Sequence, residues 1–197
     1  MGGMYPVNAH LKMLLDDIIK DSRWDMTYLG MQIMIEGLAL AAFGYLHELT
    51  GEPLLKKLLR YVMSDEARHV AFGVLSLQEV YAHMSDKEIK ERQEFAYEAS
   101  VRMRDRVMSQ EVWSRMGVNP RDVVPLVLND PTREVFQQML FAKIVPNCKK
   151  LGLLDRNDAW LRRRFEEMGV IQFENAEDTG EEYVKFELGE TLEDVQH

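Results

Sequence analysis

The chain of 197 residues is 46% hydrophobic and 29% charged, a balance that suits one folded domain with a sizeable core. Its formal net charge is −9, and residues 170–197 alone hold nine Asp or Glu and one Lys, a local balance of −8. The remaining residues are therefore almost neutral. They offer no basic surface for phosphate groups, so nucleic acid is not expected to be a direct partner.

The sequence carries no signal for export or membrane insertion. The first ten residues lack a basic stretch followed by an apolar run, and the apolar segments downstream are interrupted by Gln32, Glu36 and His47. Cys148 is the single cysteine, so no intrachain disulfide is expected, and a lone thiol beside 13 methionines fits a reducing compartment. We therefore expect a cytoplasmic protein with no membrane span.

Three helices are expected in the first part of the chain. Asn8 can cap a short helix that ends near Asp21-Ser22. A long helix should cover about 25–48, because apolar residues recur there at helical spacing up to Thr50-Gly51. Pro53 can occupy the first turn of a second long helix that reaches about His83.

Further helices follow from capping signals. Ser85 and Glu88 form a capping box, which opens a third long helix predicted to run to Met116 and to stop at Gly117. The apolar pattern does not define the inner face of this helix. Two further helices are expected to begin at Asn119-Pro120 and at Asp130-Pro131, and Pro146 should kink or end the second of them. A last, shorter helix is expected from Asp158 to Met168.

These elements predict an all-α protein built as a helical bundle. Residues 1–169 should form the helical domain and residues 170–197 an acidic, solvated C-terminal tail. Within this tail, Tyr183–Leu188 alternates weakly between apolar and polar residues, which is the only hint of a strand.

Three ionisable residues interrupt helical stripes that are otherwise apolar. Glu36 lies among Ile33, Leu40 and Phe43, where an unpaired carboxylate would need a proton, a cationic partner or a metal ion. Glu66 and His69 are three residues apart on the next helix, so both side chains can reach one ion. Because carboxylate and imidazole ligands suit iron or manganese, these three residues are the predicted metal ligands.

The pattern also has a purely structural interpretation. Chance alone places a Glu-x-x-His spacing in about one chain in three of this size, so the pair carries weight through its context. It lies mid-helix on an apolar stripe, and a second glutamate, Glu36, is expected to be buried mid-way along the preceding helix. Asp65 and Arg68 flank the pair and are predicted to support it, the Asp65 carboxylate accepting from a facing histidine and Arg68 holding that carboxylate. The alternative for these two residues is a surface ion pair.

The string Asp65-Glu66-Ala67-Arg68-His69 follows the lone Glu36 by about one helix and turn. This arrangement resembles the ferritin-like di-iron carboxylate proteins, among them the ribonucleotide reductase small subunit, acyl-carrier-protein desaturases, bacterial multicomponent hydroxylases and bacterioferritin. In that family two helices each give one Glu and two others each give a Glu-x-x-His. The resemblance covers about residues 25–82.

The resemblance extends to half of the ligand set. The family's earlier Glu and first Glu-x-x-His have no counterpart, because none of the other four histidines follows a Glu by three residues. Two arrangements could complete the set. The chain is the carboxyl-terminal part of a longer protein, so that it forms an incomplete bundle without the first helix pair, or two copies pair as a homodimer about a two-fold axis. The first arrangement is favoured, because only one short helix precedes Glu36.

The resemblance implies a two-iron centre, or manganese in its place, that activates dioxygen to oxidise a small organic substrate with electrons from a separate donor. Glu36 would ligate one iron, Glu66 would bridge and His69 would be a terminal ligand, with no catalytic residue beyond these ligands. An oxygenase or desaturase type of oxidoreductase is favoured, because about 110 residues follow the last motif, more than a minimal four-helix storage subunit needs. The alternatives are an iron-binding or storage protein and a metal-free helical assembly fragment.

Several other residues have structural interpretations that we favour. His47 is expected to be a histidine at a helix end, and Glu94 and Glu98 are expected to form a solvated acidic face. Small residues surround the predicted ligands and fit either close helix packing or a channel beside the metals. They are Gly37, Ala39, Ala41, Ala42 and Gly44 near Glu36, and Ala67, Ala71 and Gly73 near His69.

Overall fold

The first helix forms where the sequence supplies both a cap and an apolar face. In the computed structural model, which describes residues 7–177, the side-chain oxygen of Asn8 accepts hydrogen bonds from the backbone N–H groups of His10 and Leu11. Leu14 and Ile18 are the buried residues of this helix. The capped helix is α1 (Ala9–Lys20), as predicted.

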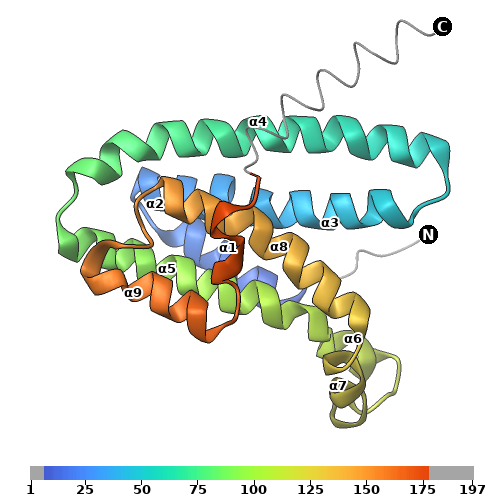
Figure 1. The fold of residues 1–197 in the computed structure, drawn as a ribbon. Helices are drawn as coiled ribbons and strands as arrows, with labels where there is room; N and C mark the ends of the chain where they lie inside the picture. Colours follow the sequence, from blue (N-terminus) through green and yellow to red (C-terminus); the bar gives the residue numbers. More distant parts are fainter. Residues whose placement is uncertain (1–6, 178–197) are drawn as a thin grey trace, which may run out of the picture.

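The described residues contain helices and no strand, which confirms the all-α prediction (Figure 1). The elements after α1 are α2 (Trp24–Tyr28), the π-helical segment η1 (Leu29–Ile35), α3 (Glu36–Leu49), α4 (Pro53–His83), α5 (Asp86–Asp105), the 3-10 turn η2 (Arg106–Met108), α6 (Gln110–Arg115), α7 (Pro120–Leu128), α8 (Pro131–Lys150), α9 (Arg156–Glu167) and the 3-10 turn η3 (Ile171–Asn175).

The first two long helices lie where the sequence predicts, and the third begins at its predicted capping box. The run from α2 through α3 is continuous and corresponds to the helix predicted over about 25–48. The side chain of Glu52 accepts from the N–H of Leu55 at the start of α4, directly beside Pro53. Ser85 and Glu88 form both hydrogen bonds of the predicted capping box at the start of α5.

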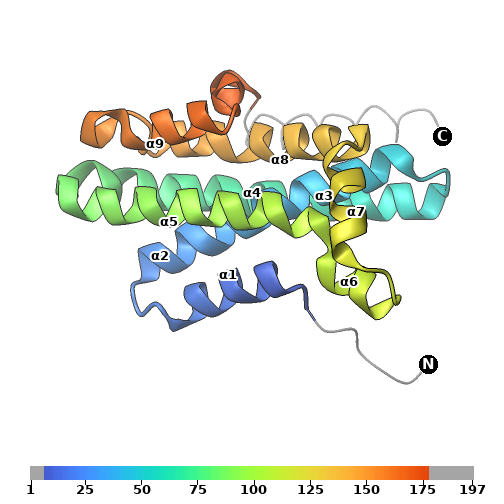
Figure 2. The ribbon, with the colours of Figure 1, turned by 90° about the horizontal axis from the view of Figure 1, so that it is seen from below.

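The third long helix, predicted to run from Ser85 to Met116, ends earlier than predicted. The chain leaves α5 after Asp105, and Ser109 adopts a left-handed conformation with φ of +46° before α6 begins. The indole N–H of Trp113 donates to the carbonyl of Met108 at 3.1 Å and so satisfies a backbone acceptor at this break. The break turns α6 and α7 across one end of the bundle (Figure 2).

Pro146 was expected to end or kink its helix. It does not end the helix, because α8 continues to Lys150. A proline inside a helix removes one backbone donor and disturbs the preceding turn. The side chain of Asn147 donates to the carbonyl of Lys143 at 2.7 Å, which supplies a hydrogen bond to that turn. Pro146 and Asn147 are both buried, so packing also holds this part of α8 in place.

Tertiary packing places the first long helix at the centre of the bundle. α3 packs against α4 on one side and against α8 on another, and η1 lies against α4 and α5. Figure 2 shows α8 and α9 as one outer layer, and α1 with α2 on the opposite side of the central helices. The core that joins these layers includes Ile33, Met34, Leu77, Phe141 and Phe165, all fully buried.

Glycines near the predicted ligands serve mainly close packing. A Cβ atom at Gly73 would lie 2.5 Å from Cβ of Gln32, so α4 and η1 can approach this closely only because Gly73 has no side chain. A Cβ at Gly37 would be in ordinary contact with Ile144 of α8. A Cβ at Gly44 would lie 3.3 Å from Cε of Met139, although Gly44 also borders a hollow of about 240 Å³ at the end of α3.

A buried ion pair connects α2 with α5. The Arg92 guanidinium of α5 donates to both carboxylate oxygens of Asp25 in α2, at 2.9 and 3.2 Å. The two side chains are 4% and 7% exposed. Bidentate pairing of this kind fixes orientation as well as charge. The sequence pattern did not predict it.

Part of the predicted acidic tail belongs to the described residues. Val170 is buried, and η3 packs against α8, with Lys149 donating to the side-chain oxygen of Asn175 at 2.6 Å. The strand hinted at in Tyr183–Leu188 lies outside the described residues.

Among residues 7–177, one helix has the length and composition of a membrane span. The continuous helix Trp24–Leu49 has a mean hydropathy of 1.5 over its most apolar window, and 44% of that window is buried inside the protein. Core helices of proteins outside membranes pass the same test, so this helix is weak evidence of a span.

Candidate metal centre

Glu36 stands at the end of an irregular stretch of helix. The π-helical segment η1 precedes it, and the N–H of Glu36 donates to the carbonyl of Met31, five residues earlier. Such wide turns are rare and frequently occur at functional sites. The segment directs Glu36 toward α4, on the side of α3 that packs against that helix.

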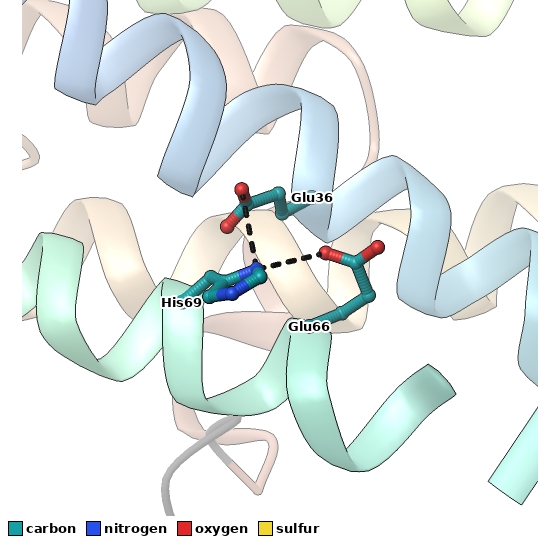
Figure 3. A group of neighbouring side chains, drawn as sticks. All are labelled: Glu36, Glu66 and His69. Carbon is teal, nitrogen blue, oxygen red and sulfur yellow. Dashed lines mark hydrogen bonds and ion pairs between the residues drawn. The ribbon is translucent and has the colours of Figure 1, made fainter. Parts of the chain in front are cut away.

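Glu66 and His69 meet Glu36 from the middle of α4 (Figure 3). The Nδ1 atom of His69 lies 3.4 Å from Oε2 of Glu66 and 3.6 Å from Oε1 of Glu36. One ligand atom from each residue lies within 4.8 Å of the others. The structure thus brings together all three residues that the sequence predicts as metal ligands.

The three side chains differ in burial. Glu36 is 16% exposed, Glu66 is 22% exposed and His69 is 58% exposed. The Oε2 atom of Glu36 is fully buried and has no hydrogen-bond partner among the described residues. A buried carboxylate oxygen without a partner carries a free-energy cost that a bound cation would remove.

Electrostatics in the group is set mainly by this burial. Burial raises the pKa of Glu36 to about 7, the nearby His69 lowers it, and the negative charge of Glu66 raises it. In the absence of a metal ion the Glu36 carboxyl therefore holds a proton up to near-neutral pH. A cation between Glu36 and Glu66 would displace that proton and oppose the repulsion between the two carboxylates.

The donor set fits a transition metal ion. Bonds of about 2.0–2.2 Å to oxygen and nitrogen place neighbouring ligand atoms of one ion about 3–3.5 Å apart. The two distances from His69 Nδ1 are close to this range. Two carboxylates and one imidazole leave coordination positions open, and the exposed side of His69 is where further ligands could approach.

Gln32 is a neighbour that sequence analysis did not single out as part of the site. It lies one helical turn before Glu36, and its Oε1 atom is also buried without a hydrogen-bond partner among the described residues. The available signal was its position, because a polar residue four places before Glu36 shares the same face of a regular helix.

Asp65 and Arg68 pair with each other on the outer surface of α4. The Arg68 guanidinium donates to the Asp65 carboxylate at 2.5 Å, and the side chains are 65% and 46% exposed. Both interpretations of these two residues expect this contact between Arg68 and Asp65. Within one chain it is the surface ion pair of the alternative interpretation, and the ion pair described for Asp65 among residues 7–177 is with Arg68 and not with a histidine.

The remaining candidates lie away from the group. His47 belongs to the last turn of α3, where its Nδ1 atom is 3.6 Å from Glu48 Oε1. Glu94 and Glu98 are exposed and pair along α5 with Lys90 and Arg102. These positions agree with a histidine at a helix end and with a solvated acidic face.

A comparison of the chain with protein-family models, with curated proteins and with solved structures gave no match. The class of the protein therefore rests on its fold and its site. It is an all-α helical bundle with a partly buried cluster of two carboxylates and one imidazole.

Proposed function

We propose that this chain binds iron, or manganese in its place, through Glu36, Glu66 and His69. In this proposal it supplies half of a di-iron carboxylate centre of an oxidoreductase that activates dioxygen. The observation that carries the proposal is the buried, unpartnered Oε2 atom of Glu36 beside a Glu66–His69 pair. A group with two carboxylates and one imidazole is short of positive charge and suits a divalent cation.

Each residue has a defined task in this proposal. Glu36 and Glu66 hold the negative charge that attracts the cation, and His69 adds a nitrogen ligand from the same helical face as Glu66. Ile33 and Leu40 are buried one turn on either side of Glu36 and limit the access of water to its carboxylate. A di-iron centre would supply the reduction of dioxygen and the oxidation of a small organic substrate, with electrons from a separate donor.

One observation favours a metal-free role in helical assembly. His69 is more than half exposed, and histidines at protein surfaces commonly lie near carboxylates without binding a metal ion. An iron-storage protein would use the same three residues, so metal binding alone does not distinguish storage from oxidation. Consumption of dioxygen coupled to oxidation of an added substrate would separate these two functions.

Metal content is the first test of the proposal. The full chain is loaded anaerobically with Fe(II), passed through a desalting column and examined by elemental analysis. We expect about one iron per chain, and none in the Glu66→Ala/His69→Ala variant. Because binding stabilises the folded state, Fe(II) at 100 times its dissociation constant should raise the free energy of unfolding by about 2.7 kcal/mol in the wild type alone.

A matched control is available on the same helix. Glu79 and His83 are an exposed glutamate and histidine near the end of α4, so Glu79→Ala/His83→Ala removes the same residue types away from the site. This variant should bind iron like the wild type. Equal iron content in the two double variants would contradict the proposed ligands, provided that circular dichroism shows both to be folded.

A further inference from the structure

α4 carries a second apolar stripe, on the side that faces away from the core. Successive stripe positions are separated alternately by four and three residues, which is the heptad spacing of a helix that pairs with another helix. Five of the seven positions are large apolar side chains that are 46–75% exposed, whereas isolated exposed apolar residues would show no such order. The stripe consists of Leu54, Leu58, Tyr61, Asp65, Arg68, Phe72 and Leu75.

The stripe lies beside the candidate metal centre. His69 follows Asp65 by four residues and precedes Phe72 by three, so it borders the stripe on the helix surface. Figure 1 shows α4 along one edge of the molecule with α3 on its inner side. A helix docked on the stripe would cover the exposed side of His69.

Six of the seven stripe residues are arranged symmetrically about a point between Glu66 and Ala67, and Leu54 has no counterpart within the stripe. Leu58 and Leu75 are equally distant from this point, as are Tyr61 and Phe72. Asp65 and Arg68 are also equally distant from it and carry opposite charges. Two antiparallel copies of α4 related by a two-fold axis at this point would therefore place leucine against leucine, aromatic ring against aromatic ring, and Asp65 against Arg68 twice.

We propose that the stripe binds a second copy of this chain, with the two α4 helices antiparallel and the two-fold axis passing between Glu66 and Ala67. Charge complementarity selects this occupant and this direction, because parallel copies would place Asp65 against Asp65 and Arg68 against Arg68. Within one chain Asp65 and Arg68 pair with each other, and in the dimer each exchanges this partner for its counterpart in the second copy.

The same axis brings two half-sites together. At 1.5 Å per residue, Glu66 lies about 1 Å and His69 about 4 Å from the axis, measured along the helix. Measured along the helix, the half-sites of the two copies, each formed by Glu36, Glu66 and His69, would therefore lie at the same level on the paired helices. This pairing of half-sites rests on the proposed function, whereas the docking itself rests on the stripe.

The association is tested by measuring the mass of the full, metal-free chain by sedimentation equilibrium over a range of concentrations. We expect twice the chain mass of 23.0 kDa. Asp65→Arg places only positive charge at the centre of the stripe, and Arg68→Asp places only negative charge there. Each substitution should weaken self-association at least ten-fold, and both positions are exposed, so the fold should be retained.

Recombining these two variants tests the antiparallel pairing. An equimolar mixture of the Asp65→Arg chain and the Arg68→Asp chain should form a heterodimer with restored affinity. The doubly substituted chain Asp65→Arg/Arg68→Asp should again form a homodimer. A dimer whose stability is indifferent to all of these changes would overturn the proposed interface, since its contacts would lie elsewhere.

The register is tested by disulfide formation between copies. Leu58→Cys/Leu75→Cys should crosslink two chains under mild oxidation, and Leu54→Cys/Leu75→Cys, displaced by one helical turn, should crosslink much more slowly. A monomer at every concentration would overturn the docking proposal and leave the stripe to a different partner. A monomer that binds iron would retain the proposed metal function, whereas a dimer that binds none would retain only the docking.

Discussion

The protein contains two groups of buried charge on the same long helix, and they differ in how completely the charge is satisfied. Asp25 meets the guanidinium of Arg92 in a bidentate pair, and both side chains are almost fully buried. Glu36 meets a second carboxylate and a histidine, and one of its oxygens has no partner among the described residues. The first group is electrically complete within the chain, whereas the second requires a proton or a cation. This difference separates a structural pair from a candidate binding site.

The largest effect is expected from breaking the complete pair. Arg92→Met should leave the Asp25 carboxylate buried without a counter-charge and lower the free energy of unfolding by about 3–5 kcal/mol, measured by urea denaturation. In Asp25→Asn/Arg92→Met no ionised group is left behind, so part of this loss should be recovered. A loss below about 1 kcal/mol in the single variant would show that Asp25 finds water or another partner.

A smaller, pH-dependent effect is expected at the incomplete group in chelator-treated protein. Because the folded state raises the pKa of Glu36 from 4.5 to about 7, the folded protein keeps a proton that the unfolded chain has lost between these values. Stability should therefore fall as pH rises through this window, by on the order of 1–2 kcal/mol, and level off above it.

Glu36→Gln should remove this pH dependence, because the amide does not titrate. Urea denaturation at several pH values compares the variant with the wild type and with Glu94→Gln, which removes an exposed carboxylate of α5. If the wild type and Glu36→Gln lost stability in parallel between pH 5 and 7, Glu36 would not be the group responsible.

The smallest effect concerns a buried group that carries no charge. Cys148 is fully buried, and burial raises the pKa of its thiol to about 12. Since the thiolate is the reactive form, a disulfide reagent at pH 8 should leave the folded protein unmodified and should titrate one thiol per chain in denaturant. Rapid reaction of the folded protein would show that this part of α8 opens readily.

Sequence reasoning succeeded where the signal is local. The signals at Asn8, Pro53 and Ser85 each act on the turn of helix that follows, and the apolar stripes of α3 and α4 repeat along a single helix. Glu36, Glu66 and His69 were identified for the same reason, because charged residues on an apolar stripe stand out without knowledge of the partners.

Sequence reasoning failed where a distant partner decides. Arg92 and Asp25 are separated by 67 residues, and the buried Gln93 donates to carbonyls of Leu153 and Arg156, so polar residues interrupt the inner face of α5. Such a mixed face lacks the clear apolar periodicity that pattern analysis uses. The end of α5 was also missed, although the contact there is local: the chain turns at Ser109, and Trp113 donates to the carbonyl of Met108 five residues before it.

The π-helical segment η1 sets the angle about the helix axis between the directions in which Asp25 and Glu36 point. Eleven residues separate Asp25 from Glu36, and in an uninterrupted α-helix they would complete about three turns and leave both carboxylates on one face. In the protein Asp25 reaches Arg92 of α5, whereas Glu36 reaches His69 of α4. The wider turns between them absorb part of the rotation, so a single continuous helix serves two different neighbours. If these wide turns were regular α-helical turns, both carboxylates would lie on one face of the helix, and only one of the two could then keep its partner.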